Sequence, residues 1–405
     1  MSSFEATAQA IHAEVEEMAV IDAHEHLPSE AVRLKMNMDA LTLFSHYCRG
    51  DLAAAGMKPD RVDYVFSDAP LSQRFSEFKP YYDLISNTTY TRAAHISMER
   101  FYGESVLTDG NLDSLTQKIR DTNKPGLYAK VLRDACNIET CLNQGYDCAD
   151  DPLLTPVMWA VGSPRCNREI AMHSGILGRE IICLDDFLEA ARLQIQNIKN
   201  RGGVGVKFFV FCMSEPSLPA AGEALNRIIE DKDLCLPQDN PITNVYFDAL
   251  LCEAQKQGLV ACVHTGYWGD YRELNPSHAI YMLDHYPDMA FDIYHVGYPY
   301  VREAILLGKT RGNVWLNMCW TYIISPHFAC EALTEMLEVV PWHKIIGFGG
   351  DYFVVEKVYG HLVLARQAIA KALAAKVCDG SFSFDKAVSL ANGMLYQNPK
   401  KLYKL

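Results

Sequence analysis

The feature that most constrains the fold is a rhythm of short apolar segments that alternate with helix-like segments from residue 200 onward. The apolar segments are GVGVKFFVF (203–211), GLVACVHTG (258–266), MAFDIYHVG (289–297), NVWLNMCW (313–320) and KIIGFGGDY (344–352). Their apolar residues fall on both faces of an extended chain. Strands of this kind, separated by amphipathic helices, are typical of a parallel sheet covered by helices.

Three further segments bring the number of predicted strands to about eight, the number that closes a barrel. They are VIDAH near the N-terminus, IETCLNQ (138–144) and TPVMWAVG (155–162). We therefore predict an α/β protein with a (β/α)8 TIM barrel that occupies residues 1–405 as a single domain. An open doubly wound sheet is the alternative. It would predict a glycine-rich phosphate loop after an early strand, and the sequence has none.

Residues 27–130 interrupt this rhythm. They hold clusters of Tyr, Phe, Arg and Lys with helical periodicity in parts and no clear strand. We predict a long, mainly helical insertion after the first strand, at the barrel mouth, where βα connections build active sites. Its candidates for a substrate pocket or lid are Lys79, Tyr82, Arg92 and His95.

The composition is that of a soluble globular protein, and it leaves a site for a small molecule open. Hydrophobic residues make up 49% of the chain and charged residues 21%, which is ordinary for a soluble protein. A net charge of -13 without a basic stripe disfavours nucleic acid as a partner. The N-terminus lacks a secretory pattern and no window approaches a membrane span, so we expect a cytoplasmic protein, which could form a homo-oligomer.

The 13 cysteines are scattered and mostly lie in apolar stretches, without a C-x-x-C pair. We interpret them as reduced core thiols. The alternative is a catalytic cysteine, which no local signature supports.

Two histidines in VIDAHEHL raise the question of a metal site. Side chains two apart on a strand point the same way, so His24 and His26 project together. They could be half of a metal site or two polar residues where a strand meets its loop. His264, His295 and Asp351 also end predicted strands, and in a parallel barrel those ends converge. One such histidine alone is better explained as a core residue, but their joint placement predicts a metal centre.

The motifs DAHEH, VHTG, YHVG and FGGD, in this order, resemble those of the amidohydrolase superfamily of metal-dependent (β/α)8 enzymes. The C-terminal segment LANGMLYQNPKKLYKL is similar to that superfamily's last helix. HTGYWGDYRELNP followed by YHVGYPYVREA resembles the branch with uronate isomerases and with amidohydrolase-like domains fused to glutamine-synthetase-like domains. Uronate isomerases also carry a helical insertion after the first strand.

The resemblance implies that His24, His26 and Asp351 bind one divalent metal, zinc or alternatively manganese. It makes His264 a further ligand or a neighbour of the metal-bound water, and it makes His295 the group that polarises a substrate carbonyl or binds a second ion. Lys207 is ambiguous, because a lysine at this strand is carboxylated and bridges two metals in binuclear relatives. Its position inside an apolar run favours a buried lysine and a single metal.

The chemistry implied is hydrolysis of an amide, ester or lactone, with Asp351 as general base for a metal-activated water. The same residues also suit a uronate isomerase-like reaction or a non-oxidative decarboxylation, and a catalytically silent binding barrel is a further alternative. Arginine with aromatic neighbours in the strand-end loops favours an anionic substrate. The candidates are Tyr267, Trp268, Arg272, Arg302 and Trp320, although Arg302 could instead face solvent from the following helix.

Overall fold

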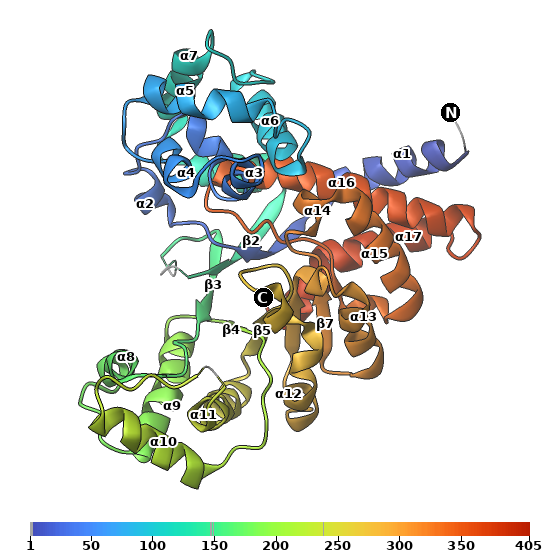
Figure 1. Cartoon of the computed structure of the whole chain (residues 1–405). Coiled ribbons are helices and arrows are strands. Elements are labelled where there is room, and N and C mark those ends of the chain that lie inside the picture. The colour runs from blue at the N-terminus through green and yellow to red at the C-terminus, as the bar shows by residue number, and fades with distance from the viewer. Residues whose placement is uncertain (1–2, 146–147, 149, 238) are drawn as a thin grey trace. The chain divides into compact units, whose positions relative to one another are not determined.

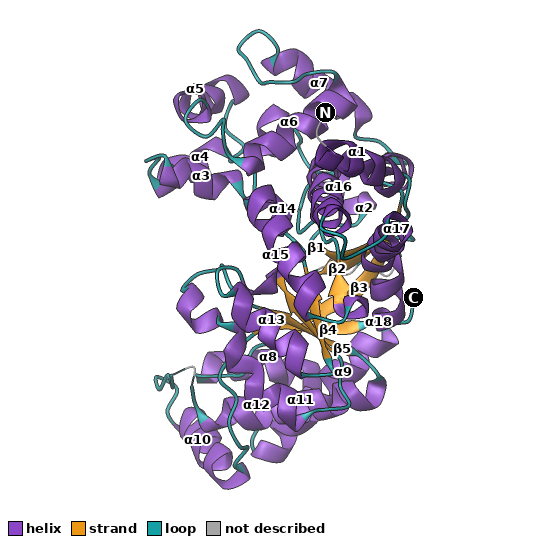
Figure 2. Cartoon of the chain, turned by 90° about the vertical axis from the view of Figure 1, so that its right-hand side faces the viewer, coloured by secondary structure: helices purple, strands orange, loops and turns teal. Residues whose placement is uncertain are grey.

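The computed structural model describes residues 3–145, 148, 150–237 and 239–405. Eight parallel strands follow one another in sequence order in one sheet, and helices connect them (Figures 1 and 2). The strands are β1 (Val20–Glu25), β2 (Ile138–Gln144), β3 (Leu154–Trp159), β4 (Gly205–Phe209), β5 (Val260–His264), β6 (Phe291–Tyr294), β7 (Val314–Asn317) and β8 (Ile345–Ile346). The predicted (β/α)8 class is therefore confirmed.

The chain forms two compact units, and each is described by itself. The first comprises Met1–Leu154, Met318–Glu338 and Gly347–Gln397, and the second comprises Thr155–Asn317, Val339–Ile346 and Asn398–Leu405. The prediction of one barrel domain over the whole chain stays a prediction.

The first unit holds β1, β2 and most of the longer helices. Its helices are α1 (Ser3–Glu16), α2 (Glu30–Arg33), η1 (Ala40–Phe44), α3 (Cys48–Ala54), α4 (Pro59–Val65), α5 (Leu71–Tyr82), α6 (Thr89–Tyr102), α7 (Leu112–Thr122), η2 (Ala129–Ala135), α14 (Thr321–Ile324), α15 (Pro326–Val339), α16 (Val355–Cys378), α17 (Phe384–Asn392) and η7 (Gly393–Gln397).

The second unit contains β4 to β8, each parallel to the next. Its helices are α8 (Asn167–Leu177), α9 (Leu184–Asn200), α10 (Leu218–Glu230), α11 (Pro241–Gln257), η3 (Tyr271–Leu274), η4 (Pro276–Ala279), α12 (Ile280–His285), η5 (His295–Gly297), α13 (Val301–Thr310), η6 (Trp342–Lys344) and α18 (Asn398–Tyr403).

The segment between β1 and β2 is long and helical, as predicted for residues 27–130. Its helix α6 buries a stripe that includes Ala93 and Ser97, and this stripe packs on α16. The two helices approach so closely that a side chain at Gly360 of α16 would lie 2.0 Å from the Ala93 carbonyl oxygen. Close backbone packing thus joins the insertion to the C-terminal part of the first unit.

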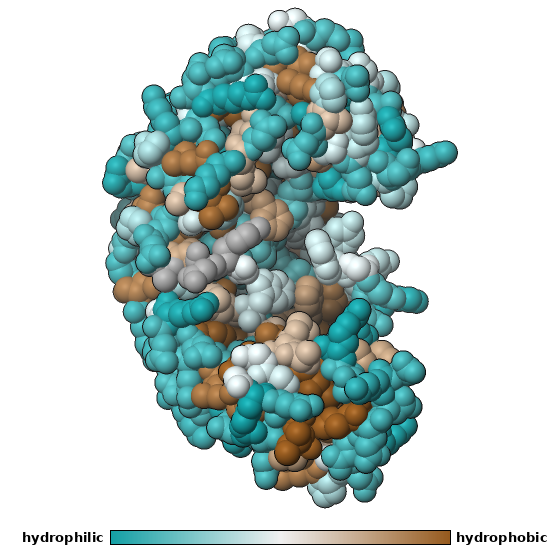
Figure 3. All heavy atoms as spheres, turned by 90° about the vertical axis from the view of Figure 1, so that its left-hand side faces the viewer, coloured by the Kyte–Doolittle hydropathy of each residue, from teal (hydrophilic) through white to brown (hydrophobic). Residues whose placement is uncertain are grey.

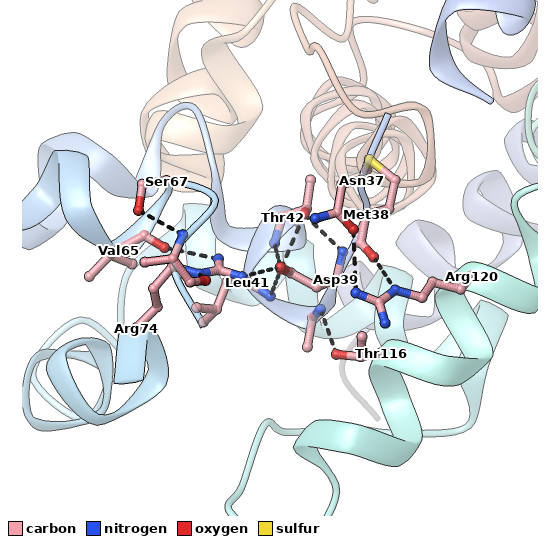
Figure 4. A network of polar contacts seen from close by, with 12 residues as sticks. Asn37, Met38, Asp39, Leu41, Thr42, Val65, Ser67, Arg74, Thr116 and Arg120 are labelled. Carbon is pink, nitrogen blue, oxygen red and sulfur yellow. Dashed lines mark hydrogen bonds and ion pairs between the residues drawn. The ribbon is translucent and has the colours of Figure 1, made fainter. Parts of the chain in front are cut away.

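A buried ion pair organises the start of the insertion (Figure 4). Asp39 caps η1 by accepting hydrogen bonds from the backbone N–H groups of Leu41 (3.0 Å) and Thr42 (3.2 Å). Its second carboxylate oxygen accepts a hydrogen bond from Arg74 of α5, at 2.5 Å. The cap sets where η1 begins, and the ion pair ties this short helix to the longer helix α5.

Two predicted strand ends differ from the observed ones. β6 ends at Tyr294, and His295 begins a 3-10 turn with a positive φ of 65°. β8 has only two residues because the Gly347 N–H donates to the Met394 carbonyl oxygen instead of extending the ladder. Asp351 therefore lies in a loop beyond β8, not at the end of a strand.

The surface in Figure 3 is mostly hydrophilic, with apolar residues in separate patches. Among the described helices, none has both the length and the apolar character that crossing a bilayer requires. All 13 cysteines are free, which agrees with the prediction of reduced thiols. The core assignment does not hold for every thiol, since Cys183, Cys212, Cys235 and Cys378 are exposed.

Candidate metal centre

Three predicted metal ligands meet in the first unit. His24 Nε2 lies 3.1 Å and His26 Nε2 lies 3.2 Å from the same oxygen, Oδ1 of Asp351. His24 and Asp351 are buried and His26 is partly exposed. Two ligand atoms about 2.1 Å from a tetrahedral zinc ion are about 3.4 Å apart, so this spacing fits the donor set of such an ion. His24 lies on β1 and His26 directly follows the last residue of this strand, Glu25, and both imidazoles point to Asp351.

Gln144 at the end of β2 orients His24. The amide nitrogen of Gln144 lies 2.7 Å from His24 Nδ1. Rotating this amide by half a turn exchanges its nitrogen and oxygen, and the oxygen then accepts a hydrogen bond from Nδ1–H. That tautomer directs the lone pair of Nε2 toward Asp351, as metal binding requires.

The backbone of Asp351 is left-handed, with a φ of 63°. Asp tolerates this conformation better than most residues, but it still needs support from its surroundings. The Asp351 N–H donates to the His24 carbonyl oxygen at 2.8 Å. His361 Nδ1 lies 3.0 Å from the Gly350 carbonyl oxygen and can donate to it. Both contacts hold the loop against β1 and α16.

Two buried carboxyl groups on β1 hold the same loop from the other side. Asp22 accepts a hydrogen bond from the Gly350 N–H at 3.0 Å, and Glu25 accepts one from the Tyr352 N–H at 2.6 Å. Burial raises the pKa of Asp22 to about 7, and burial together with the nearby charge of Asp22 raises that of Glu25 well above its usual value. One proton on this pair of neighbouring carboxyl groups therefore removes most of the cost of burying both.

Asp351 itself is held as a carboxylate. Burial raises the pKa of Asp351, but the charges and hydrogen bonds of His24 and His26 outweigh this and hold the pKa well below its usual range. An ionised carboxylate is the form that ligates a metal.

His46 and Tyr47, from the insertion, also lie next to Asp351. Burial and the nearby charge of Asp351 raise the pKa of Tyr47 well above its usual value, and the His46 ring stacks on the Tyr47 ring with 3.9 Å between the ring centroids. His46 Nδ1 is buried without a hydrogen-bond partner in the described part of the chain. Burial lowers the pKa of His46 to about 3, so the ring is neutral at physiological pH. A neutral imidazole with an unused nitrogen is suited to bind a ligand hydroxyl.

The local fold explains the position of His46. It follows η1 and has a left-handed φ of 71°, which turns the chain toward β1. Lys357 of α16 donates to the preceding carbonyl oxygen, that of Ser45, at 2.7 Å. Sequence reasoning missed His46 and Tyr47, and the only signal was the cluster LFSHYCRGDL, in which they occur.

The insertion residues chosen from the sequence have other contacts. Lys79 is exposed and pairs with Asp109, and Tyr82 is hydrogen-bonded to His95. Arg92 is exposed. The insertion residues that lie beside Asp351 are instead His46 and Tyr47. A role of Lys79, Tyr82, Arg92 and His95 in the substrate pocket stays a prediction.

The second unit brings His264 and His295 together at the ends of β5 and β6. His295 Nε2 lies 3.1 Å from His264 Nδ1, and the His264 ring packs on Phe209 at 4.7 Å. His295 is 3% exposed, so most of its ring is enclosed by protein. The roles of His264 as a metal neighbour and of His295 as a carbonyl-polarising group stay predictions.

Lys207 lies in the core of the second unit and is fully buried. Its Nζ sits 4.1 Å from the centre of the Tyr294 ring and 5.1 Å from that of Trp159. The carboxylate of Asp292 nearby accepts hydrogen bonds from Tyr403 (2.6 Å) and Asn317. A cation enclosed by aromatic rings and near a carboxylate favours the buried-lysine alternative over a carboxylated metal bridge.

Comparison with known proteins identifies the family. The sequence pattern of the amidohydrolase family matches residues 167–405, more than half of the chain. The chain belongs to the amidohydrolase family. Protein fluG of Emericella nidulans is 29% identical over 147 residues, which are 35% of this chain. Those residues span only 17% of that protein's length.

Solved structures with the same fold match this amidohydrolase along nearly its whole length. A uronate isomerase from Thermotoga maritima has a TM-score of 0.83 at 14% identity and covers 98% of this chain and 97% of its own. A glucuronate isomerase from Caulobacter crescentus has a TM-score of 0.82 at 17% identity, with 100% and 95% covered. A suggested metal-dependent hydrolase from Lactobacillus casei has a TM-score of 0.64 at 16% identity, with 96% of each chain covered.

The candidate substrate residues of this amidohydrolase have mixed environments. Tyr267 and Trp268 are exposed after β5, at 53% and 56%. Arg272 makes two hydrogen bonds to Asp270, at 2.8 and 2.5 Å, and this exposed pair lies within one loop. Their role in substrate binding stays a prediction.

The remaining two candidates lie on helices or next to one. Arg302 is exposed on α13, which agrees with the alternative in which this side chain faces solvent from the helix after β6. Trp320 is buried, and its Nε1–H donates to the Tyr90 hydroxyl at 3.0 Å. This contact gives Trp320 a packing role within the first unit.

Proposed function

We propose that this amidohydrolase-family enzyme is a metal-dependent isomerase of small open-chain sugar acids. Two observations support the proposal. The likeness to uronate and glucuronate isomerases extends over 98% and 100% of this chain, including the helical insertion. The insertion also places His46 and Tyr47 beside Asp351, and this second observation carries the proposal.

The proposal assigns the metal to His24, His26 and Asp351, with zinc or manganese as the ion and one ion per chain. When bound, such an ion supplies Lewis acidity that polarises a carbonyl or acidifies a hydroxyl. The three ligand side chains fit this role because imidazole and carboxylate donors suit either ion.

The chain's own residues then bind the sugar acid and move its proton. An isomerisation transfers a proton between adjacent carbons and consumes no water. Tyr47 lies beside Asp351 and keeps its proton, since burial and the Asp351 charge raise the pKa of the phenol well above its usual value, so the hydroxyl can donate a hydrogen bond to a substrate oxygen. His46 Nδ1 is available for a substrate hydroxyl.

Hydrolysis of an amide, ester or lactone is the second candidate. The likeness to a suggested metal-dependent hydrolase supports it, and so does the donor set, since the same three residues could hold a metal that activates water. Hydrolysis gives no role to His46 and Tyr47, and for this reason isomerisation is the first candidate. Non-oxidative decarboxylation is a third reaction that these residues could support.

The test is incubation of the metal-loaded protein with glucuronate and galacturonate in deuterated water, followed by NMR. We expect a ketose product, with deuterium at the carbon that gains the proton if that proton exchanges with solvent. Panels of amides and lactones are assayed in parallel, and His24→Ala serves as the inactive control. Turnover of an amide or lactone without any ketose would replace isomerisation by hydrolysis. No turnover in any panel would favour a silent barrel.

The purified protein is expected to bind about one equivalent of zinc or manganese per chain. The reason is that the described residues gather one cluster of three ligands, whereas Lys207 is enclosed by aromatic rings. Elemental analysis of the parent and of Lys207→Met checks this, and both should give the same metal content. Two equivalents in the parent, falling in Lys207→Met, would establish a bridging role for Lys207.

A further inference from the structure

Two cysteines in the second unit face each other across an isolated antiparallel bridge. Cys166 precedes α8, and Cys235 lies in the segment between α10 and α11. Arg165 precedes Cys166 and Leu236 follows Cys235, and the Leu236 N–H donates to the Arg165 carbonyl oxygen at 2.8 Å. This pattern makes Cys166 and Cys235 a non-hydrogen-bonded pair of the bridge.

The geometry of such a pair suits a disulfide. Directly opposed residues at non-hydrogen-bonded positions have Cα atoms about 4.5 Å apart, and their side chains project to the same face. Disulfides span Cα separations of roughly 4.4–6.8 Å. The backbone can therefore accept a bond between the two sulfur atoms with rotation of the side chains only.

The two thiols are also accessible. Cys235 is exposed and Cys166 partly exposed, whereas Cys136, Cys141 and Cys262 are buried. Thiol–disulfide exchange needs a sulfur that the small disulfide can reach, and the exposure of Cys235 provides it.

We propose that Cys166 and Cys235 are a disulfide-forming site that responds to small-molecule disulfides. The Cys235 thiolate attacks one sulfur of the small disulfide, and the other sulfur leaves as a thiolate. The Cys166 thiolate then attacks Cys235 Sγ and releases the second small thiolate. In balance, two protein thiols and one small disulfide give one protein disulfide and two small thiols.

The bond would restrain the connection between β3 and α8. This connection leaves the C-terminal end of β3, the side of the strand from which barrel enzymes build substrate-binding loops. It is already joined to α11 by hydrogen bonds from Thr243 to Ser163, at 3.2 Å, and from the Tyr246 hydroxyl to the Val161 carbonyl oxygen. A covalent bond would add a redox-dependent attachment.

The 405-residue protein is treated with oxidised glutathione and digested with trypsin, and its peptides are mapped without reduction. We expect the peptide that contains Cys166 to be linked to residues 233–256, with the loss of two hydrogens and reversal by dithiothreitol. Because residues 233–256 also contain Cys252, the mapping is repeated on Cys252→Ser, where the link should persist. Cys183→Ser, which removes an exposed thiol of the same unit, is the matched control and should also keep the link.

In Cys166→Ser the exchange should stop at a glutathione adduct on Cys235, because the thiol that completes the second step is absent. Melting temperatures in reductant verify that the serine variants fold like the parent. A parent protein that accumulates the same glutathione adduct without forming the link would overturn the proposal. A link between Cys252 and another thiol would also overturn it.

Discussion

Asp351→Asn is expected to keep the fold and most of the metal but to lose turnover by a factor of about 10²–10⁴, the usual contribution of a general acid or base. The asparagine side-chain oxygen can still ligate, yet an amide cannot accept a proton near neutral pH. Metal content by elemental analysis, and the rate on the sugar acid that the deuterium assay finds to be turned over, measure the two effects separately.

His24→Ala is the matched comparison and should lose metal and activity together. His24 is buried at 1% exposure and lies 3.1 Å from Asp351, so its loss removes a ligand that solvent cannot easily replace. If Asp351→Asn turned over near the parent rate, Asp351 could not be the group that moves the proton.

The metal ligands were predictable because local rules place them. Strand alternation predicts a shared face for residues two apart, and His24 near the end of β1 and His26 just after it do point to the same carboxylate, although the strand itself ends at Glu25. Asp351 was found through its motif, although the structure puts it in a loop with a left-handed φ. No periodicity in the sequence indicates that the strand stops at Ile346, because the backbone contact that ends it comes from η7, far along the chain.

His46 and Tyr47 could not be found in the same way. Their position depends on the cap at Asp39, its ion pair with Arg74 and the contact from Lys357 to the backbone, which join residues distant in sequence. The helical character of the insertion followed from its periodicity. Which of its polar residues faces the metal ligands depends on how its helices pack on α16, and a single sequence does not contain that information.

Gly350→Ala is expected to weaken metal binding by about 10–100-fold, the usual cost of disturbing groups that orient metal ligands. A methyl group at Gly350 would lie 1.8 Å from Glu25 Oε1 and 3.3 Å from Asp22 Oδ2. Both carboxyl groups are fully buried on β1, so neither can move aside into solvent. The loop must therefore shift, and the hydrogen bonds that fix Asp351 at its left-handed φ are lost.

Gly50→Ala is the matched control, since a methyl group there has no atom within 4 Å among the described residues. Zinc titration of the metal-free proteins gives the affinity, and melting curves without metal give the change in folding stability. We expect Gly350→Ala to lose affinity and about 1–3 kcal/mol of stability, as overpacked sites do, while Gly50→Ala keeps the parent's zinc affinity. Equal zinc affinity in Gly350→Ala and Gly50→Ala would show that the contacts of Asp22 and Glu25 do not set the position of Asp351. The metal would then be held by its three ligands alone, and the buried acid pair would serve only to pack β1.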